Sequence, residues 1–459
     1  MFKPRDYQEE CHTDTMAHLS KKNPKPTLAV VPTGGGKSYS IARLTHEFDE
    51  KTLILCPSQE ILEQNFEKFV SFGGEAGIYS ASLGSKAVGK VTYATIGSVR
   101  NLGEMFKNFG VSMLVIDEAH VGTDPTKGMF KTFLGDLDPK YLIGYTASPF
   151  RTKVYSEPFG STYTQLNMLT RTAPKLFSDI CHVTQISHLV ENGYWAPVEV
   201  YEEDFNPLGL VINSTGAEFT ESSIITVSKN NDVNNRIYRL IKRLISEGTA
   251  SILVFMDSVA NAHIMSNALK GIPSAVVEAL TKKGERKTII NKFKDGSIKV
   301  VLCESTLLTG FDFPELSTVI MGRPTQSLTV FYQAYGRLVR PYKDKVSRFY
   351  DFGYNIRRFG RPETLTIENY NKYGWGLFSE GNLLTGKPLG GPVTTKTDLD
   401  DMQKPKFRNS IKKVFEFGEH KNKDLKDVPI PYMKWAMDKA QGNMSENLYN
   451  ECKKIISTN

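Results

Sequence analysis

The stretch LAVVPTGGGKS, residues 28–38, joins a short apolar run to three glycines, a lysine and a serine. Helical spacing of apolar residues from Ser38 to Phe48 predicts a helix directly after the glycines. Glycine lets the backbone turn tightly against a ligand, and the N-terminus of a helix favours a bound anion. This order predicts a phosphate cradle in which Lys37 reaches the β- and γ-phosphates and the Ser38 hydroxyl binds magnesium.

The loop departs from the full phosphate-loop pattern at its first position, where Val31 replaces a glycine. The shorter form, Thr33-Gly34-Gly35-Gly36-Lys37-Ser38, is intact. A purely structural turn would not need a lysine and a serine after the glycines. We therefore expect the residues from Thr33 to Ser38 to bind a nucleotide.

Short apolar runs alternate with helical segments on both sides of this loop. Strands are expected at residues 28–31, 52–56, 91–94, 113–116 and 141–145, and again at 251–255, 299–303 and 318–321. Helices are expected at residues 38–48, 60–69, 237–245, 260–269 and 285–293. Apolar strands that alternate with helices indicate parallel sheets covered on both faces.

The alternation occurs twice, which predicts an α/β protein with two tandem parallel-sheet domains. The first domain is expected to span residues 1–155 and the second residues 226–358, with a less periodic bridging segment at 156–225. Residues 359–459 are rich in glycine and then in mixed charges, and we expect an accessory, DNA-binding region there, with few strong strands near the glycines. A length of 459 residues agrees with two or three domains.

Asp117 and Glu118 directly follow the apolar run of residues 113–116. They would therefore lie at the carboxyl end of a parallel strand, where such sheets bind their ligands. Asp117 suits the magnesium shell, and Glu118 suits the base that orients and deprotonates an attacking water. An adjacent acidic pair is also common on protein surfaces, but its position after a buried strand favours the catalytic interpretation.

Two arginines, Arg337 and Arg340, lie three residues apart and would share one face of a helix, with Gln333 one turn earlier. A hydrophobic core would not accept this polar row, whereas a γ-phosphate would. We expect the arginines to complete the nucleotide site from the second domain, so that hydrolysis can be coupled to motion. The alternative is a solvated basic helix.

The composition indicates the cellular environment and the kind of partner to expect for this chain. Its five cysteines are scattered singly with no CxxC pair, which argues against structural zinc and disulfides and favours a reducing cytoplasm. No apolar run is long enough to span a membrane, and residues 1–6 lack a signal-peptide core. A net charge of +7 fits either a polyanion partner or a slightly basic protein without one.

Residues 1 to about 355 resemble the DEAH type of superfamily 2 helicases and translocases, with the motifs in the family's order. The resemblance implies two RecA-like domains with ATP and Mg²⁺ in the cleft between them. It implies that Arg5 and Gln8 recognise adenine, and that Gly310 and Asp312, in the loop 309–314, sense the nucleotide.

Further elements of the resemblance concern coupling and substrate. His120, Thr146 and Ser148 are implied to link hydrolysis to movement. The residues implied to contact a nucleic-acid backbone are Pro57, Ser58, Gln64, Thr95 and Ser98.

The substrate implied by the resemblance is DNA rather than RNA. Residues 150–151 and 191–197 resemble the branch found in restriction-enzyme motors and repair helicases, and RNA-directed DEAD-box proteins usually carry Asp at the position of His120. Phage-encoded branch-migration helicases, which would work in the host cytoplasm, are similar in kind. The expected activity is ATP-dependent unwinding or remodelling of forks and junctions in replication, recombination or repair. The alternatives are an RNA helicase and a nucleotide-switched DNA-binding subunit that recruits a nuclease partner.

Residues 417–423, with Val428, Pro429, Tyr432 and Trp435, resemble a small module at the ends of some bacterial exonucleases. The simpler interpretation is that Tyr432 and Trp435 fill a small core. The alternative is that Lys421 and Lys423 contact phosphates while the neighbouring aromatic rings stack on a base.

Overall fold

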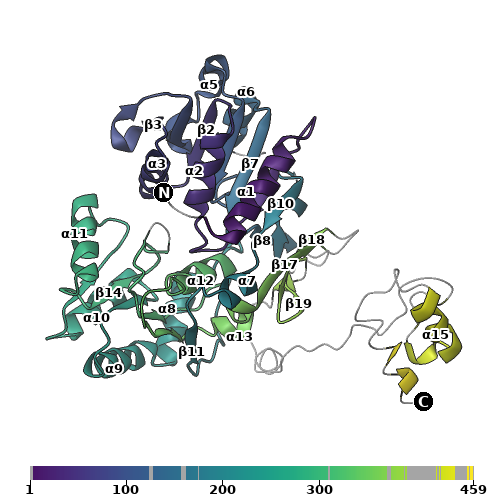
Figure 1. Ribbon diagram of the computed structural model, residues 1–459. Helices are drawn as coiled ribbons and strands as arrows, with labels where there is room; N and C mark the ends of the chain where they lie inside the picture. The colour runs from purple at the N-terminus through teal and green to yellow at the C-terminus, as the bar shows by residue number, and fades with distance from the viewer. Residues whose placement is uncertain are drawn as a thin grey trace. The chain divides into compact units, whose positions relative to one another are not determined.

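The first of two parallel sheets has the strand order β10-β1-β7-β6-β2-β5-β3-β4, in which only the short β4 runs antiparallel to its neighbour. Its strands are β1 (Thr27–Val30), β2 (Thr52–Cys56), β3 (Ala76–Ser80), β4 (Ser85–Lys86), β5 (Val91–Thr95), β6 (Met113–Asp117), β7 (Tyr141–Thr146) and β10 (Asp179–Val183). In this computed structural model, β1, β2, β6 and β7 are buried along their whole length, because helices cover both faces of the sheet (Figure 1).

The second sheet is parallel throughout, with the order β11-β16-β15-β12-β14-β13. Its strands are β11 (Val198–Glu202), β12 (Ile252–Phe255), β13 (Ser274–Val276), β14 (Val300–Cys303), β15 (Thr318–Met321) and β16 (Ser347–Asp351). The expectation of two tandem parallel-sheet domains is therefore confirmed.

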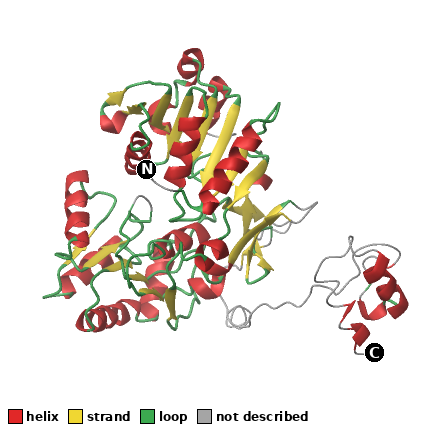
Figure 2. Cartoon of the chain, in the orientation of Figure 1, coloured by secondary structure: helices red, strands yellow, loops and turns green. Residues whose placement is uncertain are grey.

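Helices flank each sheet, as the colours of Figure 2 show. Those of the first lobe are α1 (Asp6–Leu19), α2 (Lys37–Glu47), α3 (Gln59–Val70), α4 (Ile96–Val99), α5 (Gly103–Phe109), α6 (Gly128–Leu137) and α7 (Ile186–Glu191). Those of the second lobe are α8 (Glu221–Asn230), α9 (Val233–Ser246), α10 (Val259–Ala268), α11 (Lys283–Lys294), α12 (Leu328–Tyr335) and α13 (Asn355–Phe359). Amphipathic α9 buries Val233, Ile237, Leu240, Ile241 and Leu244, and its arginines lie on the other side.

The structure describes residues 4–123, 128–156, 162–173, 175–308, 311–369, 374–386 and 388–389, and further on 420, 423, 425–439, 452–453 and 455–457. The chain divides into two compact units, residues 1–394 and 395–459. No helix among the described residues is long and apolar enough to cross a bilayer.

The bridging segment contributes an edge strand to each sheet, which its weak periodicity does not reveal. β10 pairs with β1, and β11, in which no residue is fully buried, pairs with β16. Between the lobes, β8 (Phe150–Ser156) and β9 (Thr162–Met168) pair as an antiparallel ribbon, which we call the β8–β9 ribbon.

Part of the glycine-rich region forms regular strands, contrary to the expectation of few strong strands there. β17 (Leu365–Asn369), β18 (Trp375–Ser379) and β19 (Asn382–Leu383) pair antiparallel, and β20 (Pro388–Leu389) pairs with β9. Gln185 joins this small sheet to the first lobe by donating to the Ile367 carbonyl at 2.6 Å and accepting from its N–H at 3.2 Å.

The helical placement of both arginines is wrong. Helix α12 ends at Tyr335, and Arg337 and Arg340 lie in the turns that follow, which we call the arginine turn, residues 336–340. The N–H groups of Arg337 and Leu338 bond three residues back, to Ala334 and Tyr335, so the last turn tightens and then unwinds.

In the C-terminal unit, α15 (Ile430–Lys439) covers a small core made by Leu425, Val428, Met433, Ala436 and Cys452. Tyr432 packs against this core. Trp435 does not, because half of its surface is exposed, so the expectation that it fills the core is wrong. Trp435 directly precedes the buried Ala436 on the helix, and its side chain lies on the exposed side of α15. Lys421 lies outside the described residues.

The glycine at position 144 makes the centre of the first sheet sensitive to added volume. A Cβ at Gly144, on β7, would lie 2.6 Å from the Ala119 Cβ and 2.8 Å from atoms of Leu28 and Phe177. We expect Gly144→Ala to lower the free energy of unfolding by about 1–3 kcal/mol, measured by thermal and denaturant unfolding. Gly135→Ala on α6, where no atom lies within 4 Å, is the control and should be neutral or slightly stabilising. Equal stability of the Gly144 variant and wild type would contradict the packing argument.

Candidate nucleotide-binding site

The glycine loop lies between β1 and α2, as the sequence predicts. Gly34 and Gly36 have φ angles of +77° and +84°, a region that side-chain-bearing residues rarely enter. The Gly35 N–H closes the turn by donating to the Pro32 carbonyl at 2.9 Å. Helix α2 then begins at Lys37, so its free N–H groups face the space beside the loop.

The start of α1 holds this loop from one side. The Arg5 N–H donates to Gln8 Oε1 at 3.0 Å, and Gln8 Nε2 donates to the Gly35 carbonyl at 3.3 Å. The Tyr7 hydroxyl donates to the same carbonyl at 3.0 Å. The Arg5 guanidinium lies 4.8 Å from the ring centre of Tyr194. The sequence singles out Arg5 and Gln8 but not Tyr7, whose role depends on a contact 28 residues away.

The acidic pair lies at the end of β6, opposite the loop. Lys37 Nζ is 3.1 Å from Glu118 Oε1, and Glu118 takes a left-handed φ of +49°. The buried Asp117 carboxylate accepts hydrogen bonds from the Glu118 N–H at 2.8 Å and from Asn65 Nδ2 at 2.7 Å. Asn65, on α3, is missing from the sequence prediction because nothing in its local pattern links it to β6.

Burial and neighbouring charges set the pKa values of Asp117, Glu118 and His120. Burial raises the pKa of Asp117, and the neighbouring Glu118 carboxylate raises it further. Burial alone would raise the pKa of Glu118 too, but the Lys37 ammonium holds it below its usual value. Burial lowers the pKa of His120. At neutral pH, Glu118 is therefore an ionised base beside a neutral imidazole.

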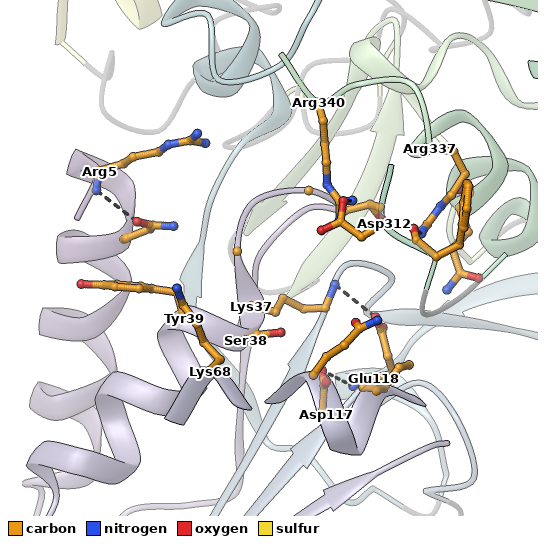
Figure 3. A pocket seen from close by; sticks show the side chains of 18 residues that line it. Arg5, Lys37, Ser38, Tyr39, Lys68, Asp117, Glu118, Asp312, Arg337 and Arg340 are labelled. Carbon is orange, nitrogen blue, oxygen red and sulfur yellow. Dashed lines mark hydrogen bonds and ion pairs between the residues drawn. The ribbon is translucent and has the colours of Figure 1, made fainter. Parts of the chain in front are cut away.

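The arginine turn faces the acidic pair from the second lobe. Arg337 donates to the Gln333 carbonyl at 3.1 Å and also to the Phe311 carbonyl, while Arg340 forms an ion pair with Asp312. Burial lowers the pKa of each guanidinium to about 10, so both remain charged at neutral pH. Figure 3 shows the two arginines on the second-lobe segment, directed toward Lys37 and Glu118.

One pocket of about 470 Å³ unites these groups from both lobes. It is lined by the predicted residues Arg5, Gln8, Thr33, Gly34, Gly36, Lys37, Ser38, Gln64, Asp117, Glu118, Asp312, Gln333, Arg337 and Arg340, together with Tyr39, Ile61, Lys68 and Phe311, which the sequence does not single out. Gln64, which the resemblance implies as a nucleic-acid contact, also lines this pocket. Gly310 lies outside the described residues.

The oxygen atoms of the pocket fit a magnesium ion and a water. A serine hydroxyl and a carboxylate, from Ser38 and Asp117, are the hard oxygen ligands that Mg²⁺ prefers. Glu118 Oε2 is buried, lies 3.4 Å from His120 Nδ1 and accepts no hydrogen bond. A buried oxygen without a donor suits a water that is to be oriented and deprotonated.

Behind the pocket, His120, Thr146 and Ser148 form a chain of contacts. His120 Nδ1 is 2.9 Å from Thr146 Oγ1, which also accepts from the Ser148 N–H at 3.0 Å. Arg151, the second residue of β8, donates from Nε to the His120 carbonyl at 2.6 Å. The polar groups behind Glu118 are therefore linked to the segment between the lobes.

The remaining predicted nucleic-acid residues follow the neighbouring strands β2 and β5. Pro57 is exposed, and Ser58 caps α3 by accepting from the Ile61 N–H at 3.3 Å. The Thr95 and Ser98 hydroxyls are 3.0 Å apart, and Ser98 accepts from the Ala81 N–H. Ser58, Thr95 and Ser98 thus bond to nearby loops, and none of the four residues lines the nucleotide pocket.

Two family matches agree with this geometry. Residues 1–151 match the family described as "Type III restriction enzyme, res subunit", and residues 234–342 match "Helicase conserved C-terminal domain". The first match falls in the first lobe and the second in the second lobe, and together they support a helicase of the superfamily 2 type.

Curated relatives are distant but extend over most of the chain. A "51.5 kDa protein" of Lactococcus phage (isolate 7-9) is 25% identical over 363 residues, which is 78% of this chain and 72% of the relative. The "DNA 3'-5' translocase XPB2" of Sulfurisphaera tokodaii is 24% identical over 74% of this chain and 79% of its own length.

Solved structures show the same fold. The type ISP restriction-modification enzyme LlaBIII bound to DNA matches 76% of this chain with a TM-score of 0.54 and 15% identity, and the chain spans only 27% of that enzyme. Dbp5 of S. cerevisiae bound to RNA and ADP BeF3 matches 76% of this chain and 84% of its own, with a TM-score of 0.51 and 17% identity. At these identities the likeness concerns the fold alone.

The hydrogen bond from Asn65 to Asp117 leads to a prediction about magnesium. In Asn65→Leu the Asp117 carboxylate loses a buried donor that orients it, so the Mg²⁺ concentration for half-maximal ATP hydrolysis should rise about 10- to 100-fold. A magnesium titration of ATP turnover measures this effect. Asn108→Leu, at an exposed position on α5, is the control and should leave the titration unchanged. An unaltered magnesium requirement in folded Asn65→Leu would refute the orienting role.

Proposed function

We propose that this protein is an ATP-dependent DNA helicase or translocase that unwinds or remodels branched DNA, such as forks and junctions. The observation that carries the proposal is one pocket that residues of both lobes line. Lys37, Asp117 and Glu118 face it from the first lobe, and Arg337 and Arg340 face it from the second. A nucleotide that contacts both lobes would favour the closed arrangement of the lobes. Hydrolysis of the nucleotide would allow the lobes to open again.

The pocket residues divide the chemistry among them. Arg5 and Gln8 would bind the adenine, and the loop N–H groups with Lys37 would hold the β- and γ-phosphates. Ser38 and Asp117 would hold Mg²⁺, which neutralises phosphate charge when it is bound.

Hydrolysis itself falls to Glu118 and the two arginines. Glu118 Oε2 would orient the attacking water and accept its proton, because this oxygen is ionised and lacks a hydrogen-bond donor. Arg337 and Arg340 would exchange their present partners for the charge that develops on the γ-phosphate.

A series of buried polar contacts supports coupling of hydrolysis to lobe movement. It runs from His120 through Thr146 to the segment that begins the β8–β9 ribbon. On the ribbon, Thr164 Oγ1 accepts from Gln326 Nε2 of the second lobe at 2.7 Å. Gln326 in turn accepts from Arg358 at 2.6 Å. A change at Glu118 would therefore reach both lobes through buried polar contacts.

DNA is favoured over RNA for the substrate, although the fold serves both. The relative XPB2 is named a DNA translocase, and LlaBIII was solved with DNA, whereas Dbp5 was solved with RNA. Pro57, Ser58, Thr95 and Ser98, at the ends of adjacent strands, would contact the nucleic-acid backbone. RNA unwinding and ATP-switched DNA binding without unwinding remain the outcomes that a direct assay must separate.

Glu118→Gln tests the proposed ATP-dependent unwinding. It removes the base but keeps the shape of the pocket, so ATP turnover should fall about 10²- to 10⁴-fold while ATP still binds. Turnover is measured with single-stranded DNA, forked DNA and RNA at matched salt, beside a strand-displacement assay on the fork. Glu67→Gln, at an exposed position on α3, is the control. Undiminished hydrolysis by Glu118→Gln would refute the role of Glu118 as the base. ATP-dependent DNA binding without displaced strand would favour the alternative of ATP-switched DNA binding without unwinding.

For the C-terminal unit we propose a second nucleic-acid contact. The rings of His420 and Tyr432 lie 4.4 Å apart and those of Tyr432 and Trp435 lie 5.2 Å apart, with Lys423 Nζ 3.2 Å from His420 Nδ1. An exposed indole in an aromatic row that ends at a lysine suits stacking on an unpaired base and contact with a phosphate.

Trp435→Ala should weaken binding of the full chain to forked DNA with single-stranded arms roughly 5- to 100-fold, because one stacked base is lost. Fluorescence anisotropy of labelled DNA measures the affinity, and DNA-independent ATP hydrolysis should not change. Leu280→Ala removes another exposed apolar side chain and is the control. Wild-type affinity of the Trp435 variant would exclude this contact.

A further inference from the structure

Lys345 lies beneath the arginine turn and does not line the nucleotide pocket. Its ammonium donates to three backbone carbonyls, those of Pro314 at 2.8 Å, Leu338 at 2.8 Å and Arg340 at 2.6 Å. An ammonium has three N–H donors and no acceptor, so these three contacts use its whole capacity. The side chain is half-buried, and the ammonium thus replaces water at each of these carbonyls.

The three carbonyls belong to two separate loops that both serve the site. Pro314 ends the stretch 311–314, whose Phe311 carbonyl accepts from Arg337 and whose Asp312 pairs with Arg340. Leu338 and Arg340 belong to the arginine turn, and the Ser347 hydroxyl also donates to the Leu338 carbonyl at 3.1 Å. Lys345 is therefore a common anchor for the backbone of both loops.

This anchor matters because the arginine turn has no helix to hold it. The turn follows the end of α12, and its carbonyls have no intrahelical partners. Arg340 must exchange Asp312 for phosphate during turnover, whereas its backbone must keep its place. A displacement of about 1 Å at such a group can lower turnover by about 10²-fold.

We propose that Lys345 is a positioning residue for ATP hydrolysis, which fixes the backbone that carries Arg337 and Arg340. This inference rests on the proposed ATP hydrolysis. Lys345 touches neither the nucleotide pocket nor the predicted nucleic-acid residues, and it acts through the arginines. It joins the nucleotide-sensing loop to the arginine turn, so that both move as one part when the lobes open or close.

The protonation of Lys345 provides a signature for this role. Burial, and then the neighbouring Arg340 guanidinium, lower the pKa of Lys345 to about 8. The other charged groups of this region are Lys294, Glu315 and the Asp312 carboxylate that pairs with Arg340. Below pH 8 the ammonium satisfies three carbonyls, but a neutral amine has only two donors. Turnover should therefore fall as the pH rises through about 8, well below the pKa of about 10 of both arginines.

Lys345→Met and Lys345→Arg in the full chain test the proposal, with Lys343→Met, at an exposed lysine two residues away, as the control. Lys345→Met should lower kcat for ATP about 10- to 100-fold and leave ATP affinity unchanged. Lys345→Arg keeps a cation at every pH used, so its turnover should lose the fall near pH 8. Lys343→Met should behave as wild type in both measurements.

Each result has one consequence. A folded Lys345→Met chain with wild-type kcat would overturn the proposal, and so would wild-type turnover that stays flat through pH 8. The wild-type pH profile tests the role of Lys345 even if a variant does not fold. Equal losses of kcat and ATP affinity would show a general structural role and also overturn it. A wild-type chain that hydrolyses no ATP at any pH would instead refute the proposed function, which is a distinguishable failure.

Discussion

The arrangement of the site depends on close contact between the glycine loop of one lobe and the arginine turn of the other, where Gly336 packs on the Thr33 side chain. A Cβ at Gly336 would lie 2.6 Å from Thr33 Cγ2, so only glycine permits this approach. Trp195, from the bridging segment, donates to the Thr33 carbonyl at 3.1 Å, while the N–H of its neighbour Ala196 donates to the Val339 carbonyl at 2.7 Å. The bridging segment therefore ties the two loops together, and the pocket forms where they meet.

The second constraint is electrostatic. Cationic side chains from both lobes line the pocket that we propose binds the phosphates, and burial makes unpaired charges costly. In this structure protein carboxylates take that place, because Glu118 pairs with Lys37 and Asp312 pairs with Arg340. A triphosphate would compete for the same cations, so binding and release of nucleotide would exchange one set of ion pairs for another. This exchange would give a physical reason for the proposed response of the two lobes to the nucleotide.

Much of this organisation can be predicted from local sequence. Apolar runs predict the central strands because those strands are buried on both faces, and the residues that follow them, Lys37 and Asp117, lie at the same sheet edge for that reason. The half-exposed edge strand β11 lacks such a run and escapes prediction. Asn65 and Tyr7 escape as well, because each is defined by one hydrogen bond to a distant segment.

The order and chemistry of the glycine loop, the acidic pair and the arginines are written in the linear sequence, because residue type and strand position are local properties. Packing between segments far apart in the chain decides the remaining features. It sets the end of α12 at Tyr335, the position of Gln64 in the nucleotide pocket and the exposure of Trp435. It also decides which carbonyls the arginines and Lys345 contact. Helical spacing alone would continue α12 through Arg340. The carbonyl contacts of Lys345 and the glycine contact at Thr33 hold that stretch as a turn, and neither contact has a local signal.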